Sequence, residues 1–351
     1  MLYNTTNPHG GEVYSRPVEL DFSANINPFG TPRGVLDAVS ASLPLLRQYP
    51  DPYCRELVAA IAEHEGVERD YILCGNGAAE LIFSFCQAVK PRKAMVLSPC
   101  FSEYETALKS VGCQVDHYFL REKDDFALTL DFMDTLSGWD GDLLMLCNPN
   151  NPTGQVLSTQ LMAKIAVHCD LHGIYLFVDE CFLDLTEGGE DLSCKELLFL
   201  MKKLIILKAF TKSYGMAGLR LGYCLSGNPE PLKAMGETTQ AWNVSIPAQM
   251  AGAAALKERE FLKKANDLIH RERKKQMDAL QTMGFRVIPS RTNYILFHSD
   301  RELREPLLER GIQIRSCANY YGLGAGWYRI AVKLPEENAR LIQALEEIVN
   351  G

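Results

Sequence analysis

Between residues 71 and 225, seven short apolar, strand-like runs alternate with helix-length amphipathic segments. This alternation constrains the fold more than any other feature, because it is the pattern of repeated βαβ units. It predicts an α/β fold with a mainly parallel sheet, in which ligands sit at the carboxyl ends of the strands. The predicted strands are residues 71–74, 94–98, 114–120, 142–147, 173–179, 203–210 and 218–225.

After Trp242 the pattern changes. Residues 258–284 form a long charged segment with helical periodicity, and it ends at a glycine, a residue suited to a helix C-cap. Strand-like runs follow at 285–290, 293–298, 311–316 and 327–332, and a helix-like segment spans 335–349. This order predicts a second, smaller α+β domain.

Composition limits the partners. The formal net charge of −8 gives no general attraction to nucleic acid or to anionic membranes, so we expect a small-molecule substrate. The 11 cysteines are scattered and form no CxxC pair or clustered Cys/His spacing, which predicts buried thiols in a reducing compartment and no metal site. Neither a signal peptide nor a membrane-spanning pattern is present in the sequence, which favours the cytoplasm.

Lys212 is the first candidate for chemistry. Lysine is the only common side chain that forms a Schiff base with an aldehyde, and it needs a site where its amine can lose a proton. Lys212 lies in KAFTKSYGMAGLRLGY, directly after an apolar strand, in a loop of small and hydroxyl-bearing residues. Taken alone, a lysine after a strand is ordinarily a surface residue.

Two further features suit a pyridoxal 5′-phosphate (PLP) site. Asp179 closes the strand GIYLFVD, where a carboxylate would keep the pyridine nitrogen protonated and make the ring an electron sink. The segment GNGAAELIF offers backbone N–H groups at a helix start for the phosphate, through Gly77, Ala78 and Ala79. In isolation, the aspartate also suits a helix N-cap and the glycines suit a simple turn.

Three more residues converge on the same cofactor. Asn151 lies in the turn NNPTG, where its amide would reach a ring oxygen, and Arg220 would add a charge-assisted contact to the phosphate. Phe101 would stack on the ring, although a phenylalanine there also suits core packing. We expect all of these positions at the carboxyl ends of strands.

The order and spacing of Asn151, Asp179, Lys212 and Arg220 resemble the class I/II PLP-dependent aminotransferases of fold type I, close to the histidinol-phosphate aminotransferases. More narrowly, the whole chain is similar to the threonine-phosphate decarboxylase family of the cobalamin pathway. The segments that carry this resemblance are HGG (9–11), LDFSANINPFG (20–30), ILCGNGAAELIF (72–83) and IRSCANYYGL (314–323). It implies an N-terminal arm and part of the small domain in 1–45, a large PLP-binding domain in 46–245 and a small domain in 246–351.

The resemblance also implies roles for individual residues. Lys212 would carry PLP as a Schiff base, Asp179 would pair with the pyridinium, and Asn151 would neighbour ring and substrate. Ala78, Ala79, Thr211 and Arg220 would hold the phosphate. The residues implied to bound the substrate are His9, Gly10, Asn25, Asn151, Arg315 and Arg329, with Arg329 taking the α-carboxylate.

Tyr49, in QYPDPY, matches a tyrosine that reaches the cofactor phosphate of the neighbouring subunit, which implies a homodimer with shared sites. Two positions depart from the wider aminotransferase pattern. Phe182 stands where a tyrosine usually bonds the cofactor's phenolic oxygen, and this resembles the decarboxylase branch. Ala209 stands where a serine usually contacts the phosphate, which puts the tightness of the phosphate cup in doubt.

Residue types alone lead to a PLP enzyme that acts on an amino acid or amine. The bond held perpendicular to the ring is the one that breaks, and a sequence does not reveal that angle. Decarboxylation of O-phospho-L-threonine to (R)-1-aminopropan-2-yl phosphate therefore rests on the resemblance, and phosphoserine stays open as a substrate. The alternatives are a histidinol-phosphate or related aminotransferase and, with little in its favour, a ligand-sensing module.

Overall fold

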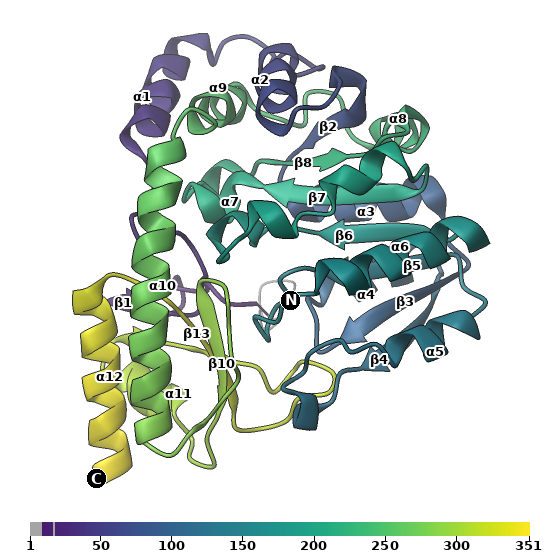
Figure 1. Cartoon of the computed structure of the whole chain (residues 1–351). Coiled ribbons are helices and arrows are strands. Elements are labelled where there is room, and N and C mark those ends of the chain that lie inside the picture. The colour runs from purple at the N-terminus through teal and green to yellow at the C-terminus, as the bar shows by residue number, and fades with distance from the viewer. Residues whose placement is uncertain (1–8, 17) are drawn as a thin grey trace.

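The computed structural model describes residues 9–16 and 18–351, and it confirms the α/β class (Figure 1). All seven strands predicted between residues 71 and 225 join one sheet, in the order β2-β8-β7-β6-β5-β3-β4. Six of them share one direction, and β8 runs antiparallel to both β7 and β2. The strands are β2 (Ile72–Gly75), β3 (Lys93–Ser98), β4 (Gln114–Phe119), β5 (Leu143–Cys147), β6 (Tyr175–Asp179), β7 (Leu204–Ala209) and β8 (Gly222–Leu225).

The prediction for residues 218–225 is wrong in its first half. Ala217–Leu219 form a 3₁₀ turn, and Arg220 adopts a left-handed conformation with φ of 54°, so the strand begins only at Gly222. In GLRL, leucines alternate with a glycine and an arginine, and this alternation resembles a strand. The positive φ of Arg220, however, interrupts extended backbone. The turn has a consequence for the site, because it delivers Arg220 to the edge of the sheet.

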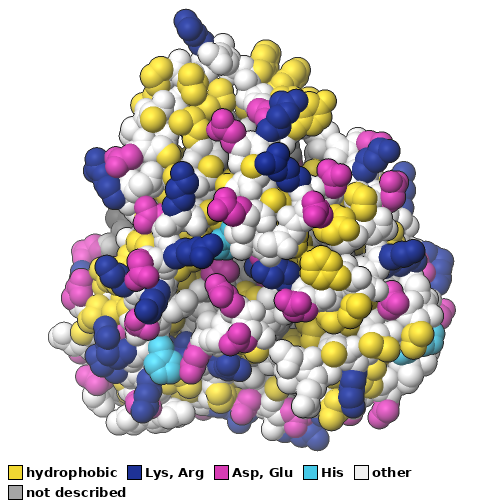
Figure 2. Space-filling model, turned by 45° about the horizontal axis from the view of Figure 1, so that its top comes forward, with side chains coloured by type: hydrophobic (Ala, Val, Ile, Leu, Met, Phe, Trp, Pro, Cys, Tyr) yellow, Lys and Arg dark blue, Asp and Glu magenta, His cyan; other side chains and the backbone are white. Residues whose placement is uncertain are grey.

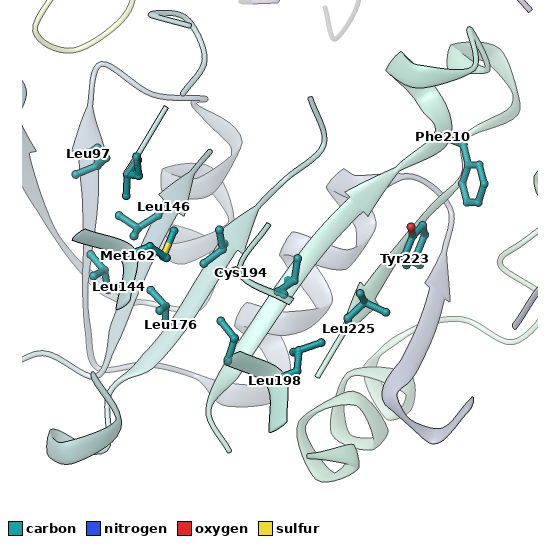
Figure 3. Close-up of a cluster of buried hydrophobic side chains, with 14 of the residues drawn as sticks. Leu97, Leu144, Leu146, Met162, Leu176, Cys194, Leu198, Phe210, Tyr223 and Leu225 are labelled. Atoms are coloured by element: carbon teal, nitrogen blue, oxygen red, sulfur yellow. The ribbon is translucent and has the colours of Figure 1, made fainter. Parts of the chain in front are cut away.

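Helices cover both faces of this sheet. Alternate residues of each strand serve opposite faces, as period-two geometry requires. Leu144 and Leu146 pack on one side, which Figure 3 shows, while Met145 between them packs on the other. The helices on the side of Leu144 are α5 (Phe132–Ser137) and α6 (Thr159–His172), and those on the side of Met145 are α3 (Ala78–Val89), α4 (Glu103–Ser110) and α8 (Pro229–Thr238).

A second, antiparallel sheet lies beside the first and has the order β12-β13-β10-β9. The predicted run 311–316 divides between two sheets, because β11 pairs in parallel with β1 near the N-terminus whereas β12 joins β13. The long charged segment forms α10, which packs with α12 on a separate apolar cluster. These elements are β1 (Leu20–Asp21), β9 (Arg286–Val287), β10 (Tyr294–His298), β11 (Ile312–Gln313), β12 (Arg315–Ser316), β13 (Trp327–Ala331), α10 (Arg259–Thr282), α11 (Arg304–Glu309) and α12 (Pro335–Asn350).

Three of the remaining helices, α1 (Arg33–Ser42), α2 (Arg55–Glu65) and α9 (Ile246–Ala255), form one end of the molecule (Figure 1). The short α7 (Phe210–Ser213) directly follows β7. Figure 2 shows hydrophobic side chains gathered on the surface at the end formed by α1, α2 and α9. Among the helices of the described residues, none is long and apolar enough to cross a bilayer.

Candidate active site

A cavity of about 390 Å³ opens where the parallel strands end, on the side of the second sheet. It brings together most of the predicted site residues, which are as far apart in sequence as Gly10 and Arg329. The cavity is lined by His9, Gly10, Ser23, Ala24, Asn25, Ala78, Ala79, Phe101, Tyr104, Cys147, Asn151, Asp179, Cys181, Phe182, Ala209, Thr211, Lys212, Arg220, Tyr320 and Arg329.

Lys212 enters this cavity from α7, directly after β7. The N-terminal segment holds its backbone in place: the amide of Asn27 donates to the carbonyl of Lys212 at 3.0 Å, and the Asn27 side chain donates to the carbonyl of Ser213 at 2.8 Å. Burial, together with the positive charge of Arg329, lowers the pKa of Lys212 from the usual 10.5 to about 8. The amine therefore loses its proton readily enough to attack an aldehyde near neutral pH.

Asp179 is the last residue of β6 and is buried, with 6% of its surface exposed. Burial raises the pKa of its carboxyl group, while hydrogen bonds oppose this effect. Its Oδ1 accepts from the Cys181 amide at 2.9 Å, and its Oδ2 accepts from the Tyr104 hydroxyl at 2.5 Å. A carboxylate held on both oxygens at the floor of a cavity is suited to pair with a ring cation.

The predicted phosphate cradle forms at the start of α3. Gly77 has a φ of 85°, which places Ala78 and Ala79 at the first turn with their N–H groups at the positive end of the helix dipole. A Cβ on Gly77 would lie only 2.5 Å from Nη2 of Arg220, so the guanidinium packs directly over the glycine. Gly77 itself does not line the cavity but leaves room for this arginine.

The prediction that every site residue follows the carboxyl end of a strand is wrong for Arg220. Arg220 precedes β8, the one antiparallel strand of the large sheet. An antiparallel strand begins at the edge where its parallel neighbours end, so Arg220 reaches the same side of the sheet as Lys212. The residue arrives there by a different route from the one that the sequence pattern indicated.

Arg329 and Asn151 meet on the other side of the cavity. Arg329, on β13, is 5% exposed and donates from Nη1 to Oδ1 of Asn151 and from Nη2 to the carbonyl of Ser23. Two buried polar atoms in this wall, Nε of Arg329 and Oδ1 of Asn25, have no hydrogen-bond partner among the described residues. Unmet hydrogen-bonding capacity at a cavity wall indicates a polar ligand.

Arg315 is not part of the cavity lining. Its guanidinium donates to Oδ1 of Asn319 at 2.8 Å and lies over the ring of Tyr320, 5.4 Å from the ring centroid. Tyr320 does line the cavity, so Arg315 stands immediately behind it. On strands β12 and β13, Arg315 and Arg329 are direct cross-strand partners, which places both side chains on the same face.

The N-terminal arm closes one side of the cavity. Gly10 packs so tightly on Ser23 that a Cβ would lie 2.3 Å from the Ser23 carbonyl oxygen. Nε2 of His9 lies 2.9 Å from Oε1 of Glu103, and its ring centroid is 5.6 Å from that of Phe101. Phe101 is thus placed at the wall where a ring-stacking residue is expected.

Tyr49 lies outside this chain's own cavity. It is 76% exposed and stacks on Trp242, with ring centroids 4.5 Å apart. Its predicted contact with the cofactor of a second subunit stays a prediction. The two departures from the aminotransferase pattern both line the cavity: Phe182 is buried with its ring centroid 5.6 Å from Nζ of Lys212, and Ala209 precedes α7.

Sequence reasoning missed several lining residues, of which Tyr104 and Tyr320 matter most for chemistry. Tyr320 could have been found, since it lies within IRSCANYYGL, the same segment that contains Arg315. Tyr104 had no such signal. It contacts Asp179 across 75 residues of sequence, from a helix whose apolar pattern predicts only core packing.

The residues that converge here fit PLP. The cavity offers an amine of lowered pKa, a buried carboxylate for the ring nitrogen, an aromatic wall, and a helix start with an arginine for the phosphate. These groups lie on different elements, yet all face one space.

Comparison with known proteins agrees with this geometry. Residues 17–345 match the family of class I and II aminotransferases. The threonine-phosphate decarboxylase of Salmonella typhimurium is 37% identical, over 100% of this chain and 98% of that protein. The adenosylcobalamin biosynthesis bifunctional protein CobDQ of Leptospira interrogans is 29% identical, over 98% of this chain and 41% of that protein. The crystal structure of the histidinol-phosphate aminotransferase from Clostridium acetobutylicum superimposes with a TM-score of 0.88 at 29% identity, covering 94% of this chain and 99% of that one.

The chain therefore belongs to the class I and II aminotransferase family and is a PLP-dependent enzyme. Within that family it is similar over its full length to threonine-phosphate decarboxylase.

Proposed function

We propose that this enzyme decarboxylates O-phospho-L-threonine to (R)-1-aminopropan-2-yl phosphate, in the cytoplasm and as a step of cobalamin biosynthesis. Full-length similarity to a threonine-phosphate decarboxylase supports the reaction, and similarity to an adenosylcobalamin biosynthesis protein supports the pathway. The eleven free cysteines, nearly all buried, suit a reducing compartment.

The observation that carries the proposal is the pair of arginines on β12 and β13. Arg315 and Arg329 face each other directly across the strands, so their side chains lie on the same face of the small sheet. A substrate with both a carboxylate and a phosphate would supply an anion for each arginine. We assign the carboxylate to Arg329, which lines the cavity, and the phosphate to Arg315, which would reach it past Tyr320.

The residues that line the cavity would also bind the cofactor. Lys212 would hold PLP covalently, Asp179 would face the ring nitrogen, and Ala78, Ala79, Thr211 and Arg220 would surround the phosphate. When bound, PLP withdraws the electrons released as a bond to the substrate Cα breaks. The protein then decides which bond breaks, because Arg329 and Asn151 fix the direction in which the carboxylate points.

Lys212 is placed to handle the proton that this reaction requires. Loss of CO₂ leaves Cα one proton short, and an amine with a pKa of about 8 can both carry and release a proton near neutral pH. Phe182 packs beside this amine and offers no hydroxyl group to the cofactor, unlike the tyrosine of the wider aminotransferase pattern.

We further propose a homodimer whose two sites are shared. The end of the molecule formed by α1, α2 and α9 exposes apolar side chains, which Figure 2 shows gathered on the surface. A second copy packed against this surface would bury these side chains and bring its own Tyr49 toward the phosphate end of the cavity. The exposed apolar residues are Leu36, Leu43, Leu45, Leu46, Tyr49, Tyr53 and Trp242.

A histidinol-phosphate aminotransferase is the second candidate, favoured by the close superposition on such an enzyme. Its substrate carries a single anionic group, a phosphate ester on the carbon that corresponds to the carboxylate, so in that half of the reaction only one of the two arginines would meet an anion.

Product analysis separates the two candidates. The PLP-loaded enzyme should convert O-phospho-L-threonine to CO₂ and aminopropanol phosphate, with O-phospho-L-serine assayed in parallel to test the role of the methyl group. Conversion of the bound cofactor to its amine form by glutamate or histidinol phosphate, without CO₂ release from O-phospho-L-threonine, would establish the aminotransferase instead.

A further inference from the structure

Tyr104 is a buried tyrosine that contacts the carboxylate of Asp179 at the cavity wall. It lies in the first turn of α4, is 1% exposed, and borders the cavity. Its hydroxyl donates to Oδ2 of Asp179 at 2.5 Å, which is at the short end of the range for such bonds to a carboxylate. The same helix start places Phe101, whose ring meets that of Tyr104 edge to face at 5.7 Å.

The surroundings of Asp179 make this bond important. The groups that face the carboxylate from neighbouring elements are the hydroxyls of Tyr104 and Tyr294, the thiols of Cys147, Cys181 and Cys224, and the more distant Lys212. Nearly all of them are neutral, so burial dominates and raises the pKa of Asp179. Hydrogen bonds to the charged carboxylate oppose this rise in the pKa of Asp179.

We propose that Tyr104 is a positioning residue that fixes the Asp179 carboxylate and stabilises its charged form, so that the proton of this pair stays on the cofactor ring nitrogen. A carboxylate that took the proton would leave the ring neutral and weaken it as an electron sink. Burial and the neighbouring Asp179 charge raise the pKa of Tyr104 well above its usual range, so its hydroxyl remains a donor at any working pH.

This inference rests on the placement of Asp179 at the ring nitrogen proposed above, but it does not depend on which reaction follows. It applies equally to a decarboxylase and to an aminotransferase. Its test therefore reads the protonation state of the cofactor and not the rate of turnover, so that a failure of the proposed reaction and a failure of this inference give different results.

The experiment uses holoenzyme loaded with PLP that carries ¹⁵N in the ring. In Tyr104→Phe only the hydroxyl is lost, and losing a hydrogen bond to a charged group should shift the proton equilibrium toward Asp179 by roughly 10- to 100-fold. The ¹⁵N resonance should move from the pyridinium position toward that of neutral pyridine.

Tyr223→Phe is the matched control. The Tyr223 hydroxyl, on β8, also donates to a buried carboxylate at 2.5 Å, that of Glu65 at the end of α2, and it lies on the other face of the large sheet. The control should leave the ¹⁵N resonance where it is in the unsubstituted enzyme. An unchanged resonance in Tyr104→Phe would overturn the inference, and so would equal shifts in both variants, since these would reflect a general loosening of the sheet.

A measurement on the unsubstituted holoenzyme decides the matter if Tyr104→Phe does not fold. The Tyr104 hydroxyl proton, identified by selective labelling of tyrosine, should resonate far downfield and exchange slowly with water, as a proton in a short bond to a charged carboxylate does. A hydroxyl proton at an ordinary position, or one in rapid exchange, would contradict the inference.

Discussion

At the scale of single residues, the free energy needed to bury each charge of the site depends on the groups that face it. Arg329 is almost fully buried, and among the described residues it pairs with amide and carbonyl oxygens and with no carboxylate. A buried cation without a counter-ion lowers the stability of the free enzyme, so the binding of an anion beside Arg329 is favourable.

Arg315 should distinguish phosphorylated from unphosphorylated substrate. We expect Arg315→Ala to weaken the binding of O-phospho-L-threonine by about 1.5–3 kcal/mol, the worth of a hydrogen bond to a charged group. Binding of L-threonine, which lacks the phosphate, should change little. Comparing KM values for the two ligands checks this. Arg310→Ala is the control, because Arg310 is exposed and donates to the carbonyl of Pro306, away from the cavity lining. Equal losses for both ligands would reject the phosphate assignment.

Lys212 should show its lowered pKa when apoenzyme captures PLP. Only the neutral amine attacks an aldehyde, so the capture rate should rise with pH up to about 8 and then level off. Stopped-flow absorbance measures this rate. N-acetyl-lysine amide is the reference, since its amine titrates near 10.4 and its reaction should keep accelerating well above pH 8. A protein profile that follows the reference would show that the cavity does not lower this pKa.

The chemistry-bearing residues were largely predictable, because each follows or precedes a strand with a strong apolar pattern. Lys212, Asp179 and Asn151 all belong to this group. Tyr104 was not predictable, since its bond to Asp179 arises from the packing of α4 on the strand ends, and a buried tyrosine on a helix has no separate signal. Arg315 was predicted in the site but stands behind Tyr320, because a sequence does not show which side chain comes between.

At the scale of elements, the site forms at one edge of the large sheet, because the directions of the strands bring the residues of the site to that edge. The parallel strands β5, β6 and β7 end at this edge, and the antiparallel β8 begins there. The pattern of the seven strands predicted the sheet but not the direction of β8. An antiparallel strand within a mainly parallel sheet is just as apolar as its neighbours, so periodicity does not reveal its direction.

Gly77 tests the junction between β2 and α3. Gly77→Ala should lower PLP affinity at least tenfold, because the new Cβ would meet the Arg220 guanidinium at 2.5 Å and displace it from the phosphate site. Gly112→Ala is the control: it has a similar φ of 74°, and its added Cβ would meet no atom within 4 Å. Both variants should lose roughly 1 kcal/mol of stability from the strained backbone. Equilibrium dialysis with PLP separates them, and equal affinities would contradict the role of this contact.

At the scale of the whole molecule, the site is assembled from segments that span nearly the entire chain. The N-terminal arm, the strand ends of the large sheet and β13 of the small sheet all contribute to one cavity. Asn27 illustrates the coupling, since it joins the arm to the loop that carries Lys212. The proposed dimer would extend this assembly to a second copy.

Mixing two defective variants tests the shared site. Tyr49→Ala should impair the site of the neighbouring subunit, and Lys212→Ala should abolish the site of its own subunit. A mixed dimer then contains one site with both defects and one with none. Activity should therefore rise above that of either variant when the two proteins are dissociated and reassembled together, whereas each variant treated alone should show no gain. No recovery from a sample shown to contain mixed dimers would place Tyr49 outside the neighbouring site.

We propose that the bond from Cα to the carboxylate is the one that breaks, and a reaction in D₂O shows which bond does. O-phospho-L-threonine labelled with ¹³C in the carboxylate is incubated with the holoenzyme, and gas and product are analysed by mass spectrometry and NMR. We expect labelled CO₂ in a one-to-one ratio with aminopropanol phosphate that carries a single deuterium at the former Cα. Retention of the ¹³C label in a 2-oxo acid, together with conversion of the cofactor to its amine form, would contradict it.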